Sequence, residues 1–189
     1  MGVAIAIAAE KCGAVVHLVA GPGVIVPENT NISLTRVISA KEMANACIDY
    51  FKVNDVAILA AAVADFTPEI QHSSKIKRGD DSLVIKLKPT TDIARTLGST
   101  KKKEQLIVGF ALETDNELEN ALGKLKRKNL DLIVLNSLRD QGAGFGTDTN
   151  KVTLIDKYNN IDKFELKSKD EVALDILGKI ASLTQNIRK

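Results

Sequence analysis

The sequence is poor in aromatic, cysteine and proline residues. Among 189 residues there is no tryptophan, aromatic residues make up 4%, and there are two cysteines and four prolines. Cys12 and Cys47 have no close spacing to each other and no nearby histidine cluster, which argues against a zinc site and against a disulfide framework. Two such cysteines are typical of the core of a cytosolic protein, so the expected location is cytoplasmic.

The chain also lacks a strong net charge and a long apolar run. Its 26 Lys and Arg residues nearly balance 24 Asp and Glu residues, and the formal net charge of +2 indicates neither nucleic acid nor a membrane as a partner. No stretch has the length and composition of a signal peptide or a membrane span. Hydrophobic residues make up 44% of the chain. A chain of this length and composition predicts one domain, residues 1–189, with one well-buried core.

Apolar runs and helical patterns alternate along the chain. The capping boxes Ser39–Glu42 and Ser168–Glu171 mark two helix starts. Buried strands that alternate with helices predict an α/β, Rossmann-like fold, with a largely parallel sheet and helices on both faces. The expected helices are 1–11, 39–51, 92–97, 116–128 and 168–183, and the expected strands are 14–20, 34–37, 56–64, 106–112 and 132–135.

Two further segments are typical of antiparallel hairpins. Residues 83–87 alternate between apolar and polar and follow a turn-like sequence, so we expect them to pair with residues near Lys75. Residues 152–156 and 163–166 flank the turn-forming sequence Tyr158-Asn159-Asn160. We interpret both hairpins as additions to the main sheet.

The glycine-rich loop that binds phosphates in many such folds does not occur in this sequence. No G-x-G-x-x-G is present, and the glycine-rich run at 142–146 follows a predicted strand but precedes no helix. The chain begins directly in a predicted helix, where a strand and a glycine-rich turn normally come first. This weighs against an NAD(P)- or flavin-binding oxidoreductase domain, which stays an alternative.

The stretch from Leu59 to Arg78 has the composition of a nucleotide site. A run of small residues ends at Asp65, and the cations Lys75, Lys77 and Arg78 follow ten residues later. Small side chains let a ligand approach the backbone, a carboxylate can hold hydroxyls or a metal, and a mobile basic loop can close over phosphates. The plain alternative is a buried alanine-rich strand followed by a solvated charged loop. These residue types alone do not decide between the two.

Other candidate residues follow the later strands, at the edge where open α/β sheets bind ligands. Phe110 lies in a predicted strand with Glu113 and Thr114 at its end, Asn136 follows the next strand, and glycines 144–146 lie beyond it. Taken singly, each has a plain reading as a core residue, a turn residue or a flexible loop.

Two helical features add polar groups. The run 90–93 opens a helix, so its backbone N–H groups could bind a polar ligand. The alternative is that the Asp92 carboxylate only stabilises the helix through its dipole. Lys124 and Lys128 are four residues apart on one helical face, where they could grip one anion together or form a solvated face.

In their order along the chain, these motifs resemble the phosphopantothenoylcysteine synthetases of coenzyme A biosynthesis, in the bacterial form that uses CTP. The resemblance covers almost the whole chain, and the run from A-A-V-A-D-F-x-P to K-I-K is quite specific together with G-F-A-x-E-T. The matching runs are A-I-A-I-A-A-E-K-C-G-A-V-V, L-V-A-G-P, S-A-K-E-M, A-A-A-V-A-D-F-T-P, K-I-K-R, T-D-I, I-V-G-F-A-L-E-T, K-L-K-R-K-N-L-D-L-I-V-L-N and G-F-G-T-D-T-N-K-V.

The resemblance implies a reaction. CTP, with Mg²⁺, activates the carboxylate of 4′-phosphopantothenate as an acyl-cytidylate, and the amine of cysteine then displaces CMP to form an amide. Lys75 matches a catalytic residue that engages the CTP phosphates. The other positions that match nucleotide contacts are Leu59, Ala60, Ala61, Asp65, Thr91, Asp92, Ile93, Ala94, Phe110, Lys124 and Lys128.

The resemblance also implies partners. Family members generally form homodimers, for which a hairpin such as 152–166 could supply an interface, and bacterial versions often carry a phosphopantothenoylcysteine decarboxylase domain upstream. Neither nucleic acid nor a membrane is expected.

The chain departs from the family pattern in a few places. Arg78, Thr91 and Leu112 replace the usual Lys, Pro and Ala. The family's opening strand and its Gly/Ser-rich turn have no counterpart before Met1. A non-catalytic nucleotide-binding subunit, which takes the missing strand from a partner chain, therefore stays a second alternative.

Overall fold

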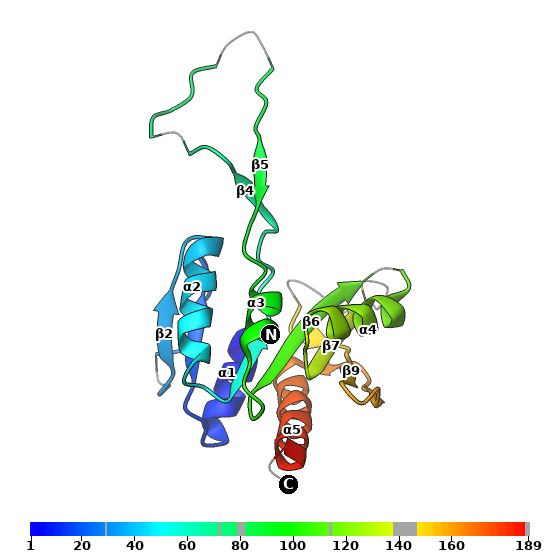
Figure 1. Cartoon of the computed structure of the whole chain (residues 1–189). Coiled ribbons are helices and arrows are strands. Elements are labelled where there is room, and N and C mark those ends of the chain that lie inside the picture. The colour runs from blue at the N-terminus through cyan, green and yellow to red at the C-terminus, as the bar shows by residue number, and fades with distance from the viewer. Residues whose placement is uncertain (29, 72, 79–81, 114, 138–146, 188–189) are drawn as a thin grey trace.

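The computed structural model describes residues 1–28, 30–71, 73–78, 82–113, 115–137 and 147–187, and all structural statements below concern these residues. They form a mixed α/β body from which one long arm projects (Figure 1).

The central sheet has five strands in the order β10-β9-β7-β6-β3. Strands β3 (Val56–Leu59), β6 (Leu106–Glu113) and β7 (Leu132–Ser137) are parallel. Strand β9 (Thr153–Asp156) lies antiparallel beside β7, and β10 (Ile161–Lys163) lies antiparallel beside β9. The hairpin predicted over 152–166 is confirmed as an antiparallel addition to the sheet beside β7, although its second strand lies at Ile161–Lys163 and not at 163–166.

Strands β1 (His17–Ala20) and β2 (Ser33–Arg36) form a separate parallel pair. In the described part of the chain, no ladder joins this pair to the central sheet. A further two-stranded sheet, β8 (Thr149–Asn150) with β11 (Lys167–Ser168), was not expected from the sequence.

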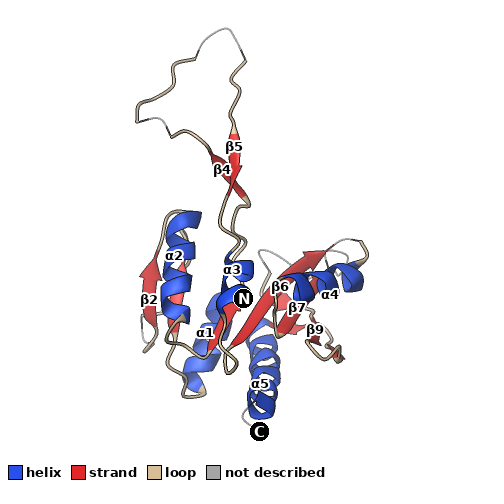
Figure 2. Ribbon diagram, viewed as in Figure 1, coloured by secondary structure: helices blue, strands red, loops and turns tan. Residues whose placement is uncertain are grey.

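Helices cover both faces of the sheet, as the sequence predicts (Figure 2). Helices α1 (Gly2–Lys11) and α5 (Lys169–Ile187) pack on one face, and α2 (Ala40–Phe51), α3 (Ile93–Thr100) and α4 (Glu117–Arg127) pack on the other.

Residues of β6 alternate between the two cores, as the period of a strand requires. Leu106 and Val108 pack with α1 and α5, whereas Ile107 and Ala111 pack with α2, α3 and α4. None of the described helices has the length and hydropathy needed to cross a membrane.

Both capping boxes form. The backbone N–H of Glu42 donates to the Ser39 hydroxyl at 3.2 Å, and the Glu42 carboxylate accepts the N–H of Ile38 at 2.8 Å. The Glu171 N–H donates to the Ser168 hydroxyl at 3.2 Å in the same way. These contacts satisfy donors that a helix start leaves without intrahelical partners.

Two sequence predictions about the region after β3 are wrong. The strand expected at 56–64 ends at Leu59, because the pairing with β6 ends there and the N–H of Val63 donates back to the carbonyl of Ala61. In the described part of the chain, the expected pairing of residues 83–87 with residues near Lys75 does not form. The ladder lies instead at the base of the arm, between β4 (Phe66–Pro68) and β5 (Leu87–Pro89). Prolines at 68 and 89 lack the N–H donors that a longer ladder requires.

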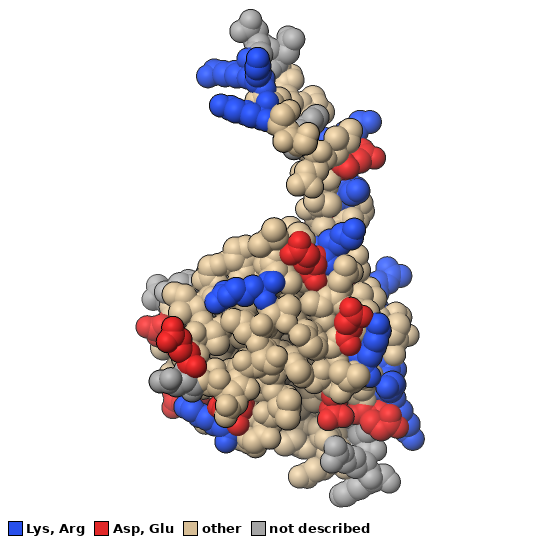
Figure 3. Space-filling model, turned by 90° about the vertical axis from the view of Figure 1, so that its left-hand side faces the viewer, with Lys and Arg blue, Asp and Glu red and all other residues tan. Residues whose placement is uncertain are grey.

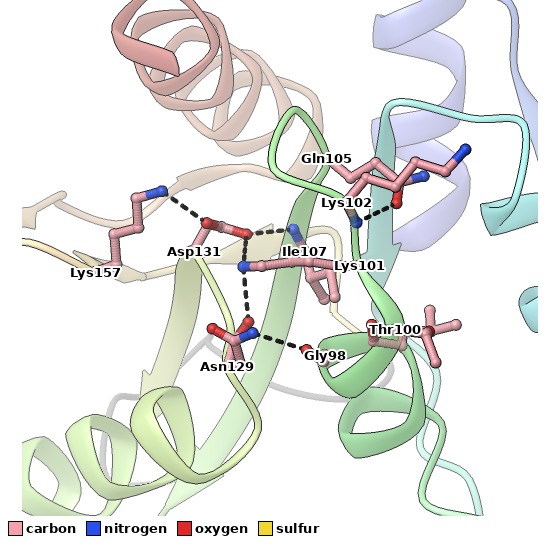
Figure 4. Close-up of polar contacts among 10 residues, drawn as sticks. Gly98, Thr100, Lys101, Lys102, Gln105, Ile107, Asn129, Asp131 and Lys157 are labelled. Atoms are coloured by element: carbon pink, nitrogen blue, oxygen red, sulfur yellow. Dashed lines mark hydrogen bonds and ion pairs between the residues drawn. The ribbon is translucent and has the colours of Figure 1, made fainter.

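A buried ion cluster holds the start of β7 (Figure 4). Asp131 is 1% exposed. Its carboxylate accepts the backbone N–H of Ile107 at 2.8 Å and forms ion pairs with Lys101 at 2.7 Å and Lys157 at 3.0 Å. The end of α3, the start of β6 and the start of β7 are therefore tied together.

The end of α4 joins this cluster through a close backbone approach. Asn129, in the left-handed conformation with φ 50°, donates its side-chain amide to the carbonyl of Gly98 at 2.7 Å. A Cβ at Gly98 would lie 1.9 Å from the carbonyl oxygen of Lys128. Only glycine at this point of α3 allows the C-terminus of α4 to come so near.

A second ion cluster forms where the β9–β10 hairpin meets α5. Lys179 contacts Asp156 at 2.9 Å and Asp162 at 2.8 Å. Burial acts to raise the pKa of Asp156, but hydrogen bonds from Lys179 and Asn160 outweigh it and hold that pKa below its ordinary value.

Candidate functional site

One cavity of about 690 Å³ reaches from the carboxyl ends of β3 and β6 deep into the body. In open α/β sheets ligands bind at this edge. We call the residues around the carboxyl ends the mouth of the cavity: Leu59, Ala60, Ala61, Val63, Ala64, Asp65, Thr90, Thr91, Asp92, Ile93, Ala94, Gly109, Phe110, Lys124 and Lys128.

The structure brings together nearly all the residues predicted to contact a nucleotide. The eleven that line the mouth are Leu59, Ala60, Ala61, Asp65, Thr91, Asp92, Ile93, Ala94, Phe110, Lys124 and Lys128. They come from the segment after β3, the start of α3, strand β6 and the last turns of α4. Their separation along the chain makes this convergence informative, since a set of ordinary core and surface residues has no reason to share one cavity.

Lys75 does not lie with them. It is exposed, with Lys77 and Arg78, on the arm between β4 and β5 and is not among the cavity-lining residues. Figure 3 shows this arm standing away from the body, with basic side chains toward its far end. Its catalytic role therefore stays a prediction, which requires the arm to fold back over the mouth.

The base of the arm is fixed to the mouth by two hydrogen bonds. The hydroxyl of Thr90 donates to the carbonyl of Ala64 at 2.7 Å, and the N–H of Thr90 donates to the carbonyl of Asp65 at 2.9 Å. Thr90 holds the segment before the arm against the segment after it. Sequence reasoning missed this role and placed Thr90 only in the run 90–93 that opens a helix.

The two lysines of α4 reach the mouth, and each meets a carboxylate. Lys128 contacts Asp92 at 2.9 Å, and Lys124 contacts Glu113 at 3.3 Å. Asp92 also caps α3, since its side chain accepts the N–H of Arg95 at 3.1 Å. The prediction that both lysines share one helical face is confirmed, whereas a joint grip on an anion requires that these pairs rearrange.

Asp92 titrates as a partner of Lys128. Partial burial acts to raise its pKa, but the hydrogen bonds from Lys128 and from the N–H of Arg95, with their charges, outweigh burial and hold the pKa of Asp92 below its ordinary value. The carboxylate is therefore ionised at neutral pH.

A metal ion can bind at the mouth only if a bound ligand supplies most of the atoms that coordinate it. The described residues contain no cluster of three or more metal-ligating side chains. Asp65 is exposed at the mouth, and its carboxylate has no hydrogen-bond or ion-pair partner in the described part of the chain. One carboxylate together with phosphate oxygens and water is the usual arrangement for Mg²⁺ bound with a nucleotide, so the residues fit that ion.

Strand β6 packs closely against Leu130 at Gly109, which lines the mouth. A Cβ at Gly109 would lie 2.7 Å from the Cδ1 of Leu130. A larger residue there would push the strand or Leu130 aside. Glycine at 109 was visible in the sequence, but its neighbour across the core was not.

The remaining candidates divide into two groups. Asn136 is at the end of β7 and donates to the side-chain oxygen of Asn150 at 2.8 Å, away from the cavity lining. Glu113 meets Lys124 but does not line the cavity. Thr114 and glycines 144–146 lie outside the described residues.

Comparison with known proteins identifies the family. Residues 1–183 match the DNA/pantothenate metabolism flavoprotein C-terminal domain. The chain belongs to this family. The resemblance found in the sequence is thereby confirmed, and the chain corresponds to the phosphopantothenoylcysteine synthetase part of CoaBC proteins.

Two curated relatives illustrate the similarity. A "Cysteine/Cysteine sulfinic acid decarboxylase" from an unknown prokaryotic organism is 60% identical over 183 residues, which cover 97% of this chain and 51% of that protein. The coenzyme A biosynthesis bifunctional protein CoaBC of Bacillus subtilis is 42% identical over 185 residues, 98% of this chain and 45% of that protein. The chain thus spans about half the length of the relatives it matches.

Solved structures share the fold. The crystal structure of the C-terminal domain of CoaBC has a TM-score of 0.81 and 36% identity, and the match covers 98% of this chain and 82% of that chain. A Cab2 mutant in complex with phosphopantothenate-cysteine has a TM-score of 0.61, and the match covers 83% of this chain and 54% of that chain. At 20% identity the latter shows a common fold alone. The Rossmann-like α/β architecture predicted from the sequence is confirmed.

Proposed function

We propose that this chain is a phosphopantothenate–cysteine ligase domain of coenzyme A biosynthesis, which uses CTP with Mg²⁺. CTP would activate the carboxylate of 4′-phosphopantothenate as an acyl-cytidylate with release of pyrophosphate. The amine of cysteine would then attack the acyl carbon and displace CMP. Family membership supports amide formation between phosphopantothenate and cysteine, and the choice of CTP rests on the sequence resemblance.

The observation that carries the proposal is the convergence at the mouth of the cavity. Eleven residues matched to nucleotide contacts come from four separate segments and line one cavity at the ligand-binding edge of the sheet. The small side chains at 60–62 leave the backbone open to a base or ribose. The start of α3 at 91–94 presents backbone N–H groups at the same place.

The charged groups suit a reaction that builds negative charge on phosphoryl oxygens. Lys124 and Lys128 stand on one wall of the mouth, and Asp65 offers a carboxylate to nucleotide-bound Mg²⁺ or to ribose hydroxyls. Lys75 would arrive with the arm and stabilise the α-phosphate during attack. Mg²⁺ supplies charge neutralisation at the phosphates.

Three alternatives stay testable. An oxidoreductase domain would bind NADH or FMN, for which no glycine-rich fingerprint exists in the sequence. A partner-requiring subunit would bind CTP but turn over only with a second chain. A cysteine decarboxylase, as the 60% identical relative is named, would release CO2 from cysteine without CTP.

The first experiment is calorimetric titration of Mg-CTP into the chain, with Lys75→Ala and Lys86→Ala in parallel. Lys86 is also an exposed cation on the arm, so it is a matched control for charge. We expect saturable binding by the unmodified chain, binding at least about tenfold weaker in Lys75→Ala, and no change in Lys86→Ala. Equal affinities in all three proteins would refute the role of Lys75.

The second experiment measures the products. The chain is incubated with 4′-phosphopantothenate, cysteine, Mg²⁺ and either CTP or ATP, and mass spectrometry follows the amide and the nucleoside monophosphate. One CMP for each amide supports the proposal. CO2 release from cysteine would overturn the proposal. In the calorimetric titration, binding of NADH or FMN in place of CTP would also overturn it.

A homodimer is a further part of the proposal. Strand β10 is at the edge of the central sheet, and Ile161 on it is 41% exposed, so this edge offers a pairing surface. A monomeric mass in light scattering at all concentrations would contradict the dimer.

A further inference from the structure

The two carboxylates that pair with the lysines of α4 differ in where they lie. Asp92 and Lys128 both line the mouth, so the ion pair between them is part of the cavity wall. Glu113, at the end of β6, does not line the cavity, although its partner Lys124 does. The carboxylate of Glu113 therefore holds the Lys124 ammonium from a position outside the cavity lining.

The period of β6 places Glu113 beside α4. Ala111 belongs to the core that α2, α3 and α4 cover, and Glu113 is the next residue on the same face of the strand. Helix α4 packs along this face, and Ala111 and Ala121 share that core (Figure 2). Glu113 thus meets two side chains from successive turns of α4, those of Asn120 and Lys124.

Of the two ion pairs, the one between Lys124 and Glu113 is held more loosely. Its charged atoms are 3.3 Å apart, whereas charge-assisted hydrogen bonds of this kind are usually about 2.7–2.9 Å long. The other oxygen of Glu113 accepts a long hydrogen bond from Asn120, at 3.4 Å. Lys128 and Asp92 are 2.9 Å apart, and Asp92 is fixed as the cap of α3. An anion at the mouth therefore draws Lys124 from its partner more readily than Lys128.

A phosphate group can replace Glu113 as the partner of Lys124. The lysine side chain is 31% exposed and flexible, and it already lines the mouth, so its ammonium can turn from the end of β6 to a bound ligand. Lys128 can contact the same ligand and keep Asp92, because an ammonium group carries more than one N–H donor. The two lysines then bind one anion together although only one ion pair opens.

We propose that Glu113 is the resting partner of Lys124, and that a phosphate group of the ligand displaces it when the mouth is occupied. Glu113 is a positioning residue that competes with the ligand for one ammonium group. Since the pair must open before Lys124 can bind, Glu113 lowers the affinity of the mouth for anions and promotes the release of an anionic product. The inference rests on the proposed function, which supplies a triphosphate as substrate and pyrophosphate as product.

A double-mutant cycle on this pair tests the proposal. Glu113→Gln keeps the size of the side chain and removes its charge, and Lys124→Ala removes the partner. Glu119→Gln is the matched control, because Glu119 is an exposed acidic residue of α4 that does not line the cavity. Calorimetric titration with Mg-CTP gives the affinity of the unmodified chain, of the three single variants and of the variant that carries both Glu113→Gln and Lys124→Ala.

We expect Glu113→Gln to bind Mg-CTP about two- to fivefold more tightly, which corresponds to the loss of one partly exposed ion pair that competes with the ligand. Stopped-flow displacement should show the gain as slower dissociation. In the Lys124→Ala background the same substitution should have no such effect, and Glu119→Gln should bind like the unmodified chain. A purely structural role of Glu113 predicts the opposite sign, because a poorly placed Lys124 would weaken binding.

Two results in the cycle would overturn the proposal. Unchanged or weaker binding by Glu113→Gln would show that this carboxylate does not compete for Lys124. Equal tightening in the Lys124→Ala background would assign the effect to overall charge and not to the pair.

Failure of the proposed function gives a different result. If the unmodified chain binds no Mg-CTP, that function is wrong, and the same cycle is measured with inorganic triphosphate and Mg²⁺, which probe the lysines without a nucleoside. The same pattern of affinities for triphosphate would support the role of Glu113 independently of CTP. Absence of triphosphate binding by the unmodified chain would overturn that role as well.

Discussion

Removal of the Asp131 carboxylate should destabilise this fold more than removal of any exposed acidic group. The side chain is 1% exposed and has three partners: the N–H of Ile107, Lys101 and Lys157. Asp131→Ala would leave the buried N–H of Ile107 without its acceptor and two ammonium groups without their counter-charge, while Lys101 keeps its hydrogen bond to the carbonyl of Asn129 at 2.9 Å. Lys101, whose side chain is 13% exposed, has little access to water as a substitute.

The magnitude follows from the geometry. Removal of one partner from a buried, hydrogen-bonded ion pair costs about 3–5 kcal/mol, because the other charge remains buried. Domains have about 5–15 kcal/mol of total stability, so the variant would lose a large fraction of it. For a chain of this size, 1 kcal/mol shifts the melting temperature by about 2–4 °C, and the expected decrease is therefore about 6–20 °C.

Urea denaturation followed by circular dichroism measures the loss, with thermal melts as a second readout. Asp162→Ala is the matched control, because Asp162 also contacts a lysine, at 2.8 Å, but its side chain is 46% exposed. Exposed pairs contribute about 0–1 kcal/mol, so this variant should stay close to the unmodified chain. A loss below about 1 kcal/mol for Asp131→Ala, or equal losses for the two variants, would refute the reasoning.

Three further predictions concern the mouth, acid stability and the close approach of α3 to α4. Lys128→Ala should weaken Mg-CTP binding at least about tenfold in calorimetry, whereas Lys126→Ala, on the same helix but away from the mouth, should not; equal effects would contradict the site. The lowered pKa of Asp156 means that its contribution to stability is complete above its unfolded value of about 3.9 and is lost as pH falls through the lower folded value. Urea midpoints measured below about pH 4 should therefore depend less on pH in Asp156→Asn. Gly98→Ala should cost about 1–3 kcal/mol, because the new Cβ would lie 1.9 Å from a backbone oxygen, whereas Gly178→Ala, with open space around it in α5, should stabilise by up to about 1 kcal/mol; urea denaturation of both variants decides.

Local patterns predict much of this fold. Helix periodicity and the two capping boxes give all five helices, because caps are formed by residues three positions apart. Strands β3, β6 and β7 also appear as apolar runs in the right order, whereas β10 at Ile161–Lys163 was expected at 163–166. Several residues of the mouth follow a strand or begin a helix, and strand ends of one parallel sheet meet at one edge. The full set, which includes Phe110 in β6 and Lys124 and Lys128 at the end of α4, came from the family resemblance.

The errors arise where the partner of a segment is distant in the chain. Small apolar residues at 60–64 have the same composition whether they lie in a sheet or line a cavity, so the end of β3 was not predictable. Alternation at 83–87 indicated a strand but not its partner, and the pairing moved to the base of the arm. The contacts of Asp131 join residues 24 to 30 positions apart, which no local pattern reports.

The hydrogen bonds of Thr90 have a consequence for how the molecule responds to a ligand. They join Thr90, at the end of the arm, to residues 64 and 65, at its start. This junction lies directly beside the 91–94 segment that opens α3. A ligand that contacts residues 91–94 therefore lies next to the fixed base of the arm, and Lys75 lies on that arm farther from the body. Occupancy of the mouth and the direction of the arm are then two linked equilibria, and each orientation of the arm changes ligand affinity by the same factor by which the ligand favours that orientation.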